Sequence, residues 1–143
     1  MKVSNLLAHK GSEVATISQE RTVGDAVSML KERRIGALVV SAASSPYAGI
    51  LSERDIVRAL ADHGTDVLGL VVADLMTSDV TTCGPDTTVT DLMGLMTDRR
   101  IRHVPVVSEG GLVGMVSIGD VVKARFDELE GEKKELLEYV SAR

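Results

Sequence analysis

Apolar residues follow a helical spacing twice along the chain, once in each half. In residues 23–30 and again in residues 89–96, apolar side chains recur at i, i+3, i+4 and i+7. This spacing lines one face of an α-helix and predicts an amphipathic helix packed on a core. The positions are Val23, Ala26, Val27 and Leu30, and then Val89, Leu92, Met93 and Met96.

Each of these helices is flanked by runs that have the character of buried strands. A short β-rich stretch precedes it, and two nearly continuous apolar runs joined by a turn follow it. Continuous apolar strands indicate a sheet that is covered on both faces. The predicted strands are residues 14–17, 37–41 and 48–51 in the first half, and residues 80–82, 104–107 and 112–116 in the second. A further helix is predicted to begin at Glu53 and at Ile118.

The two halves are copies of one unit, because four blocks match in the same order at separations of 65 to 69 residues. The blocks are residues 3–7 with 72–76, Thr22-Val23 with Thr88-Val89, Arg33-Arg34-Ile35 with Arg99-Arg100-Ile101, and residues 49–57 with 114–122. A unit of about 60 residues buries too little apolar surface to be comfortably stable alone. We therefore predict an α+β (or α/β) fold of two β-α-β-β-α repeats, packed sheet to sheet about a pseudo-two-fold axis.

The predicted boundaries are residues 1–65 for the first repeat and 66–127 for the second. Residues 128–143 form a C-terminal tail rich in Glu, Lys and Leu, which predicts an amphipathic helix. Its apolar residues, Leu129, Leu136, Leu137 and Val140, need a partner surface on this chain or on a second copy.

Composition narrows the class of protein. The 143 residues carry a net charge of −5 and include only two tyrosines and one phenylalanine, which argues against nucleic acid or a membrane surface as partner. No segment has the apolar length of a signal peptide or a membrane span, so a cytoplasmic protein is predicted. The three histidines and Cys83 lack the spacing of metal ligands, and no nucleophile–base arrangement is found. We therefore expect no metal site and no enzyme.

A Gly-apolar-x-Ser-x-x-Asp motif closes each repeat and carries the candidate chemistry. It contains Ser52 and Asp55 in the first copy, and Ser117 and Asp120 in the second. A carboxylate at a helix start accepts charge-assisted hydrogen bonds from vicinal hydroxyls, and the free N–H groups there attract phosphate. The same residues form a capping box, which stabilises a helix without any ligand. The two roles are compatible, and the doubled occurrence favours a ligand.

These blocks resemble the cystathionine-β-synthase (CBS) domain, and two in tandem resemble a Bateman module. The resemblance rests on the Gly, Ser and Asp positions of the motif and on the strand Ile101-Arg102-His103-Val104-Pro105-Val106, and it covers residues 1–127. It implies a regulatory module that binds AMP, ADP, ATP or NAD and signals to an unidentified protein by a change of conformation or of a homodimer. The resemblance assigns ribose to Asp55 and Asp120. A ligand-free interaction scaffold and an S-adenosylmethionine sensor are alternatives.

Differences between the copies predict two unequal sites. Arg54 offers a planar pair of donors to a phosphate, whereas Gly119 allows a ligand to approach the backbone. Arg102 and His103 stand where the first copy has Gly36 and Ala37, and aliphatic side chains would have to enclose the adenine. The predicted binding residues are Thr16, Ile17, Gly36, Ala37, Leu38, Ser52, Arg54, Asp55, Val80, Arg102, His103, Val104, Pro105, Ser117, Gly119 and Asp120, with Ile50 and Met115 as further apolar walls.

Overall fold

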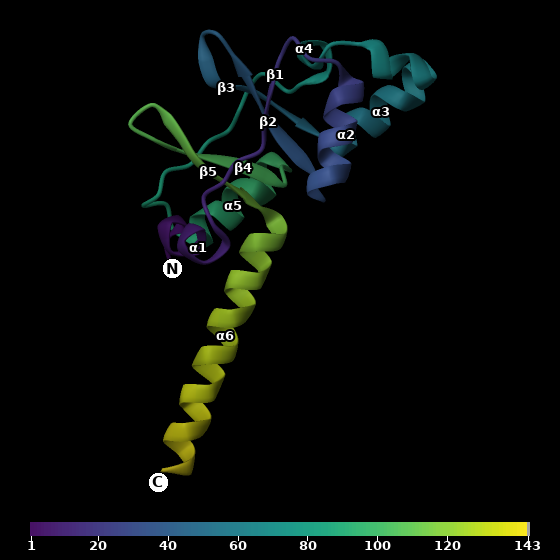
Figure 1. The fold of residues 1–143 in the computed structure, drawn as a ribbon. Helices are drawn as coiled ribbons and strands as arrows, with labels where there is room; N and C mark the ends of the chain where they lie inside the picture. Colours follow the sequence, from purple (N-terminus) through teal and green to yellow (C-terminus); the bar gives the residue numbers. More distant parts are fainter. Residues whose placement is uncertain (143) are drawn as a thin grey trace.

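The computed structural model describes residues 1–142 and contains two similar α/β units and one long helix (Figure 1). The first unit contains β1 (Thr16–Ser18), α2 (Val23–Arg33), β2 (Ala37–Ala42), β3 (Ser45–Ser52) and α3 (Glu53–His63). The second contains α5 (Val89–Arg99), β4 (His103–Ser108), β5 (Gly111–Ser117) and α6 (Ile118–Ser141). The remaining elements are α1 (Val3–Lys10), a 3₁₀ segment over Gly64–Gly69 and α4 (Val72–Leu75). The predicted two-repeat α+β fold is confirmed.

The two sheets differ in their first strand. In the first unit β1 runs parallel to β2, and β2 runs antiparallel to β3, giving the order β1-β2-β3. In the second unit β4 and β5 form an antiparallel pair, and Cys83 forms a single parallel bridge to Val106. The prediction of a strand over residues 80–82 is therefore wrong.

Two prolines explain the missing strand. In the first unit the N–H of Val39 donates to Ala15 O, and the N–H of Gln19 donates to Ser41 O. The residues 66 positions later are Pro105 and Pro85. Proline has no N–H, so both outer bonds are lost from the second sheet. Only the two bonds centred on Cys83, to Pro105 O and from Val107 N, remain. Pro105 therefore ends hydrogen bonding on this side of β4.

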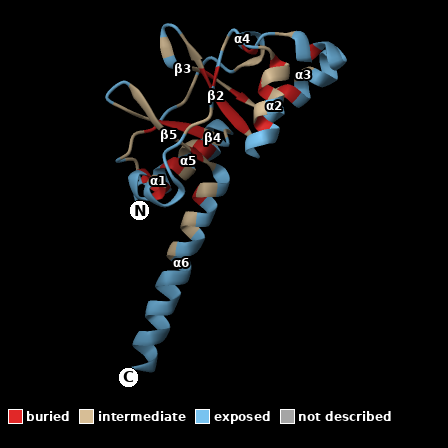
Figure 2. Ribbon diagram, viewed as in Figure 1, coloured by how far each residue is buried: buried red, intermediate tan, exposed pale blue. Residues whose placement is uncertain are grey.

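Each unit completes its core with a segment from the other repeat. Val3 and Leu6 of α1 are buried in the core formed by residues 83–121, whereas Val67 and Val72 are buried in the core of the first unit. Figure 2 shows buried residues of α1 facing the second unit. The buried side chains confirm the predicted helical faces, with Val23, Ala26 and Leu30 in one core and Val89, Leu92 and Met96 in the other. The sequence boundary between residues 65 and 66 is therefore not a boundary in the packing.

Matching backbone bonds hold the two exchanged segments. The N–H of Val3 donates to Thr87 O and the N–H of Val89 to Met1 O, at 2.8 and 2.9 Å. In the first unit the N–H of Val72 donates to Arg21 O and the N–H of Val23 to Leu70 O, both at 2.8 Å. Because each pair joins a lead segment to the start of a helix in the other repeat, the exchange is reciprocal. It is the arrangement expected of a pseudo-two-fold pair.

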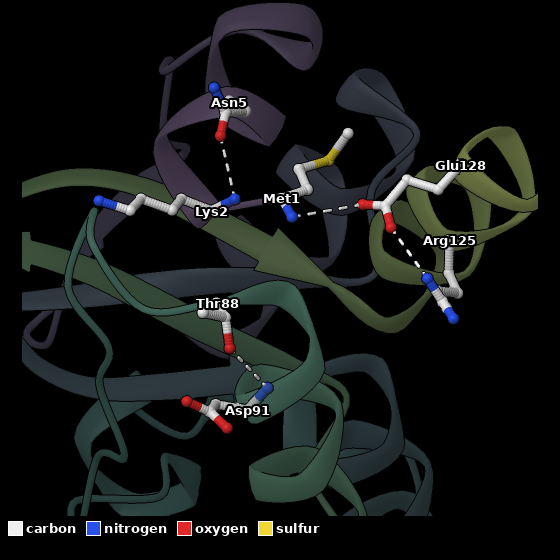
Figure 3. Close-up of polar contacts among 7 residues, drawn as sticks. All are labelled: Met1, Lys2, Asn5, Thr88, Asp91, Arg125 and Glu128. Carbon is white, nitrogen blue, oxygen red and sulfur yellow. Dashed lines mark hydrogen bonds and ion pairs between the residues drawn. The ribbon is translucent and has the colours of Figure 1, made fainter. Parts of the chain in front are cut away.

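Side chains fix the start of α1 against the second unit (Figure 3). The amino group of Met1 lies 3.7 Å from Glu128 Oε1, which is an ion pair too long for a hydrogen bond, and Arg125 donates to Glu128 Oε2 at 2.9 Å. The N–H of Lys2 donates to Asn5 Oδ1 at 3.0 Å. The start of the chain is thus held on α6.

The last helix is a single element. α6 runs for 24 residues from Ile118 to Ser141, so the helix predicted after Ser117 and the tail helix predicted over residues 128–143 form one continuous helix, and residue 143 lies outside the described residues. Its only fully buried residue is Val121. From Leu129 to Ala142 every residue is exposed, and the helix extends away from the rest of the molecule (Figures 1 and 2). Within residues 1–142, none of the helices combines the length and apolarity needed to cross a membrane.

Candidate ligand-binding cleft

The glycine of each repeated motif provides space for the exchanged segment. A Cβ atom on Gly114 would lie 2.8 Å from a methyl group of Leu7, and one on Gly49 would lie 2.5 Å from the sulfur of Met76. Leu7 and Met76 are equivalent residues, 69 positions apart. The motif glycines therefore allow the lead segment of the other repeat to pack directly on β3 or β5.

The edges of these two strands have different hydrogen-bonding partners. On β3, Ile50 forms two backbone bonds with Thr77, at 3.0 and 2.9 Å, which close that edge. On β5, the equivalent residue is Met115, and its carbonyl accepts a hydrogen bond from Lys10 Nζ at 2.7 Å. A side chain thus takes the place of a backbone bridge at β5. The side of the molecule next to β5 is correspondingly hollowed.

The hollow is a cleft of about 700 Å³ between the two repeats. The predicted binding residues that line it are Gly36, Ala37, His103, Ser117 and Asp120, and the predicted wall Met115 also lines it. The other lining residues are Lys10, Glu13, Val14, Ala15, Arg33, Arg34 and Ile35. Predicted residues outside this lining are Thr16, Ile17, Leu38, Ile50, Ser52, Arg54, Asp55, Val80, Arg102, Val104, Pro105 and Gly119.

Asp120 lies at the base of α6 and is held on one oxygen. Its Oδ2 accepts a hydrogen bond from the N–H of Ser117 at 2.8 Å and forms an ion pair with Lys10 Nζ at 2.5 Å. Ser117 Oγ accepts the N–H of Asp120 at 3.2 Å, which completes a capping box. Burial raises the pKa of Asp120, but the hydrogen bonds from Lys10 and Ser117 outweigh it and hold the pKa below its usual value. Asp120 is therefore a carboxylate at neutral pH.

Cations outnumber carboxylates around the cleft. Lys10, Arg33 and Arg34 line it together with Glu13 and Asp120. Arg34 ends α2 in the left-handed region, with φ of 54°, a conformation that non-glycine residues adopt rarely. The sequence predicted none of these three cations as binding residues. Arg33 and Arg34 could have been found from the sequence, because they belong to one of the repeated blocks.

His103 lies where the repeats meet. Its Cε1 is 3.6 Å from the position of a Cβ atom built on Gly36, and Glu53 Oε1 is 3.4 Å from the same point. His103 and Gly36, two predicted binding residues from different repeats, are thus close together. Burial lowers the pKa of His103, and the nearby Glu53 only partly offsets this. At neutral pH the imidazole is therefore uncharged and can accept as well as donate a hydrogen bond.

The motif of the first repeat has the same cap in a different setting. Asp55 Oδ2 accepts hydrogen bonds from the N–H and the hydroxyl of Ser52, at 2.9 and 3.0 Å. In Asp120 the second donor is Lys10 instead of a serine hydroxyl. The predicted binding roles of Ser52, Arg54 and Asp55 stay predictions.

Other candidate chemistry is not favoured by the geometry. In the described part of the chain, no three His, Cys, Asp or Glu side chains are grouped closely enough to hold a metal ion. Cys83 is buried in the second core, and burial raises its pKa to about 11. A thiol with such a pKa is a poor nucleophile at neutral pH.

Doubled α/β units with exchanged lead segments and a cleft between them define a tandem-repeat module. The family model described as "CBS domain" matches residues 7–62 and again residues 72–127. The chain therefore belongs to the CBS-domain family and carries two CBS domains in tandem, a general regulatory ligand-binding module.

Relatives with known sequences and structures support this assignment. The chain is 38% identical over 146 residues to the mitochondrial CBS domain-containing protein CBSX3 of Arabidopsis thaliana, covering 96% of this chain and 71% of that protein. It is 43% identical to the CBS-domain containing protein ATU1752 of Agrobacterium tumefaciens, with a TM-score of 0.84, covering 87% of this chain and 99% of that structure. A hexameric CBS-CP12 protein from cyanobacteria is 30% identical, with a TM-score of 0.76, covering 85% and 66%.

Proposed function

We propose that the chain is a regulatory module that binds an adenosine-containing nucleotide in the cleft beside Asp120, with AMP, ADP, ATP and NAD as the candidate ligands. The observation that carries the proposal is the position of Asp120, a carboxylate at a helix start that pairs with Lys10, in a cleft of about 700 Å³ that Arg33 and Arg34 also line. Sites for small molecules span about 300–1,000 Å³. The cleft therefore has the size and the charge distribution that a nucleotide requires.

Each part of a nucleotide has a matching group. The carboxylate of Asp120 is suited to the two vicinal hydroxyls of ribose. Lys10, Arg33 and Arg34 are suited to phosphates, since guanidinium and ammonium groups are the usual donors to phosphate oxygens. The aliphatic residues that line the cleft give an uncharged wall for the base, and these are Val14, Ala15, Ile35 and Met115. S-Adenosylmethionine is less favoured, because its cationic sulfonium would lie among these cations.

The proposal assigns binding to this chain and no catalytic step. Family membership supports it, because the Agrobacterium relative is matched over 99% of its structure and is described only as a CBS-domain containing protein. A bound ligand signals only if it binds one arrangement of the two repeats better than another. The cleft lies between the repeats, so a ligand there contacts both and is placed to bias their arrangement. The regulated protein and a location in the cytoplasm stay predictions.

The test compares two aspartates in equivalent capping boxes. Asp120→Asn keeps a carbonyl oxygen for the cap but removes the negative charge, and Asp55→Asn makes the same change away from the cleft. We expect calorimetry with AMP, ADP, ATP and NAD to show binding to the wild type. Asp120→Asn should weaken it by about 10- to 100-fold, the cost of a lost charge-assisted hydrogen bond, and Asp55→Asn should leave the cleft unaffected.

Thermal unfolding gives the broader screen. A ligand at 100 times its dissociation constant stabilises the folded state by about 2.7 kcal/mol, which a melting curve detects readily. If no adenosine-containing compound, S-adenosylmethionine included, raises the melting temperature at millimolar concentration, the nucleotide proposal is wrong and a ligand-free scaffold is favoured. Equal losses in both asparagine variants would place binding elsewhere or in both repeats.

A further inference from the structure

Two arginines that line the cleft are not neutralised by carboxylates of the chain. Arg33 and Arg34 lie in the lining with Asp120, and within residues 1–142 neither arginine forms an ion pair. The third cation, Lys10, is paired with Asp120. Glu13 also lines the cleft but pairs with neither arginine. Unpaired charges of one sign in a cleft attract ions of the opposite sign from solution, so this wall favours an anion.

The backbone places the two arginines side by side at the end of α2. Arg33 is the last residue of the helix, and Arg34 follows it in the left-handed region with φ of 54°. The N–H groups of Arg34 and Ile35 both donate to Leu30 O, so the chain leaves the helix in a tight turn. Adjacent Cα atoms are about 3.8 Å apart. Both guanidinium groups can therefore reach the same part of one ligand.

The second repeat contains a matching pair that lies outside the lining of this cleft. Arg99 and Arg100 occupy the same repeated block, and Arg100 also has φ of 54°. Two positions after Arg100 the chain has Arg102, where the first repeat has Gly36. Gly36 lines the cleft and brings no side chain into it. The arginine pair is thus a feature of both repeats, but only the first pair shares the cleft with Asp120.

Two guanidinium groups match two linked phosphates better than they match one. A guanidinium binds a phosphate through two parallel N–H···O hydrogen bonds. A single terminal phosphate has three free oxygens and a charge of about −2 at most at pH 7. Once Lys10 and one arginine are bound to it, few acceptor positions are left for the other arginine. A second phosphate supplies further oxygens and further negative charge.

We propose that the cleft selects adenosine nucleotides with two or more linked phosphates, such as ADP, over the monophosphate AMP, and that Arg33 and Arg34 contact the linked phosphates. This inference rests on the proposed function and adds the phosphate count of the ligand. The wild type should bind ADP at least about tenfold more tightly than AMP, which is the worth of one charge-assisted hydrogen bond.

The test is calorimetry of the full chain with adenosine, AMP and ADP. Arg33→Gln with Arg34→Gln removes both charges, so we expect ADP to bind roughly 100-fold more weakly, AMP roughly tenfold more weakly and adenosine as before. The preference for ADP over AMP should then disappear. The matched control, Arg99→Gln with Arg100→Gln, makes the same change in the second repeat and should keep the preference.

A second pair of variants protects the result against an effect on folding. Because glycine adopts positive φ without strain, Arg34→Gly and Arg100→Gly both suit their backbone at φ of 54°. Arg34→Gly should lose most of the preference for ADP, and Arg100→Gly should lose none of it.

The results separate this inference from the proposed function. If the wild type binds AMP as tightly as ADP, or if the Arg99 and Arg100 variants lose the preference as fully as the Arg33 and Arg34 variants, the inference is wrong and nucleotide binding still stands. If adenosine, AMP and ADP all fail to bind, the proposed function itself is wrong and the inference falls with it.

Discussion

At the scale of single residues, Lys10 is the group that distinguishes the two repeats. It contacts Asp120 and the carbonyl of Met115, whereas the matching carboxylate Asp55 is held by Ser52 alone. A ribose that binds Asp120 has to compete with Lys10 for that carboxylate. A nucleotide brings phosphates that give the displaced ammonium group a new partner, and a nucleoside does not.

Lys10→Met is therefore expected to change the preference between nucleoside and nucleotide. Adenosine should bind more tightly, because nothing has to be displaced from Asp120, and ATP should bind more weakly, because a phosphate donor is lost. We expect the ratio of the two dissociation constants to change by about tenfold, the worth of one charge-assisted interaction. Calorimetry measures both ligands, and Lys2→Met is the matched control, since Lys2 pairs with the exposed Asp86. An unchanged ratio would contradict this role for Lys10.

His103 predicts how stability depends on pH. Its pKa is lowered by burial from 6.5, so below pH 6.5 the unfolded chain takes up a proton more readily than the folded chain. The free energy of unfolding should then fall as the pH is lowered through and below 6.5. Above pH 6.5 both the folded and the unfolded chain carry a neutral His103, and this loss of stability should be absent. Urea unfolding between pH 5 and 8, compared with the same series for His103→Asn, isolates this contribution. If the two series keep the same slope, His103 is not the residue responsible.

At the scale of elements, the exchanged segments depend on two glycines that permit close packing. A Cβ atom at Gly49 would approach both Met76 and the backbone carbonyl of Thr77, at 2.5 and 3.0 Å. At Gly114 the nearest atoms it would meet all belong to the side chain of Leu7. A side chain can move away more readily than a backbone bridge can. The two substitutions are therefore unequal, although the glycines are equivalent in the repeat.

We expect Gly49→Ala to be the more destabilising change. Overpacking of this kind costs about 1–3 kcal/mol, and Gly114→Ala should fall at or below the lower end of that range. The free energies of unfolding of both variants can be compared in urea. Met76→Ala in combination with Gly49→Ala should restore part of the loss, because it removes the nearer obstacle. Equal losses of stability in the two variants would show that the backbone bridge to Thr77 does not make Gly49 the more sensitive position.

At the scale of the whole molecule, the sequence predicts the elements far better than their partners. The helical faces, the strand pairs and the two caps follow from local spacing, so they could be read directly. The exchange of α1 could not, because α1 and α4 are equivalent and packing either on its own unit or on the other one gives the same apolar pattern. Lys10 was missed for the same reason, since it reaches Asp120 only through that exchange. The loss of the strand before α5 could have been predicted, because Pro85 and Pro105 occupy the positions equivalent to Gln19 and Val39.

The exchange also sets an order of events during synthesis. The first core draws on residues 15–76, a continuous segment, whereas the second joins residues 3–7 to residues 83–124. At about 5–20 residues per second on the ribosome, the 118 residues between Val3 and Val121 (121 − 3) take roughly 6–24 s to appear. The first unit can fold while α1 still waits for its partners. The cleft around Asp120 needs Lys10 on one side and the start of α6 on the other, so it is complete only when nearly the whole chain has been made.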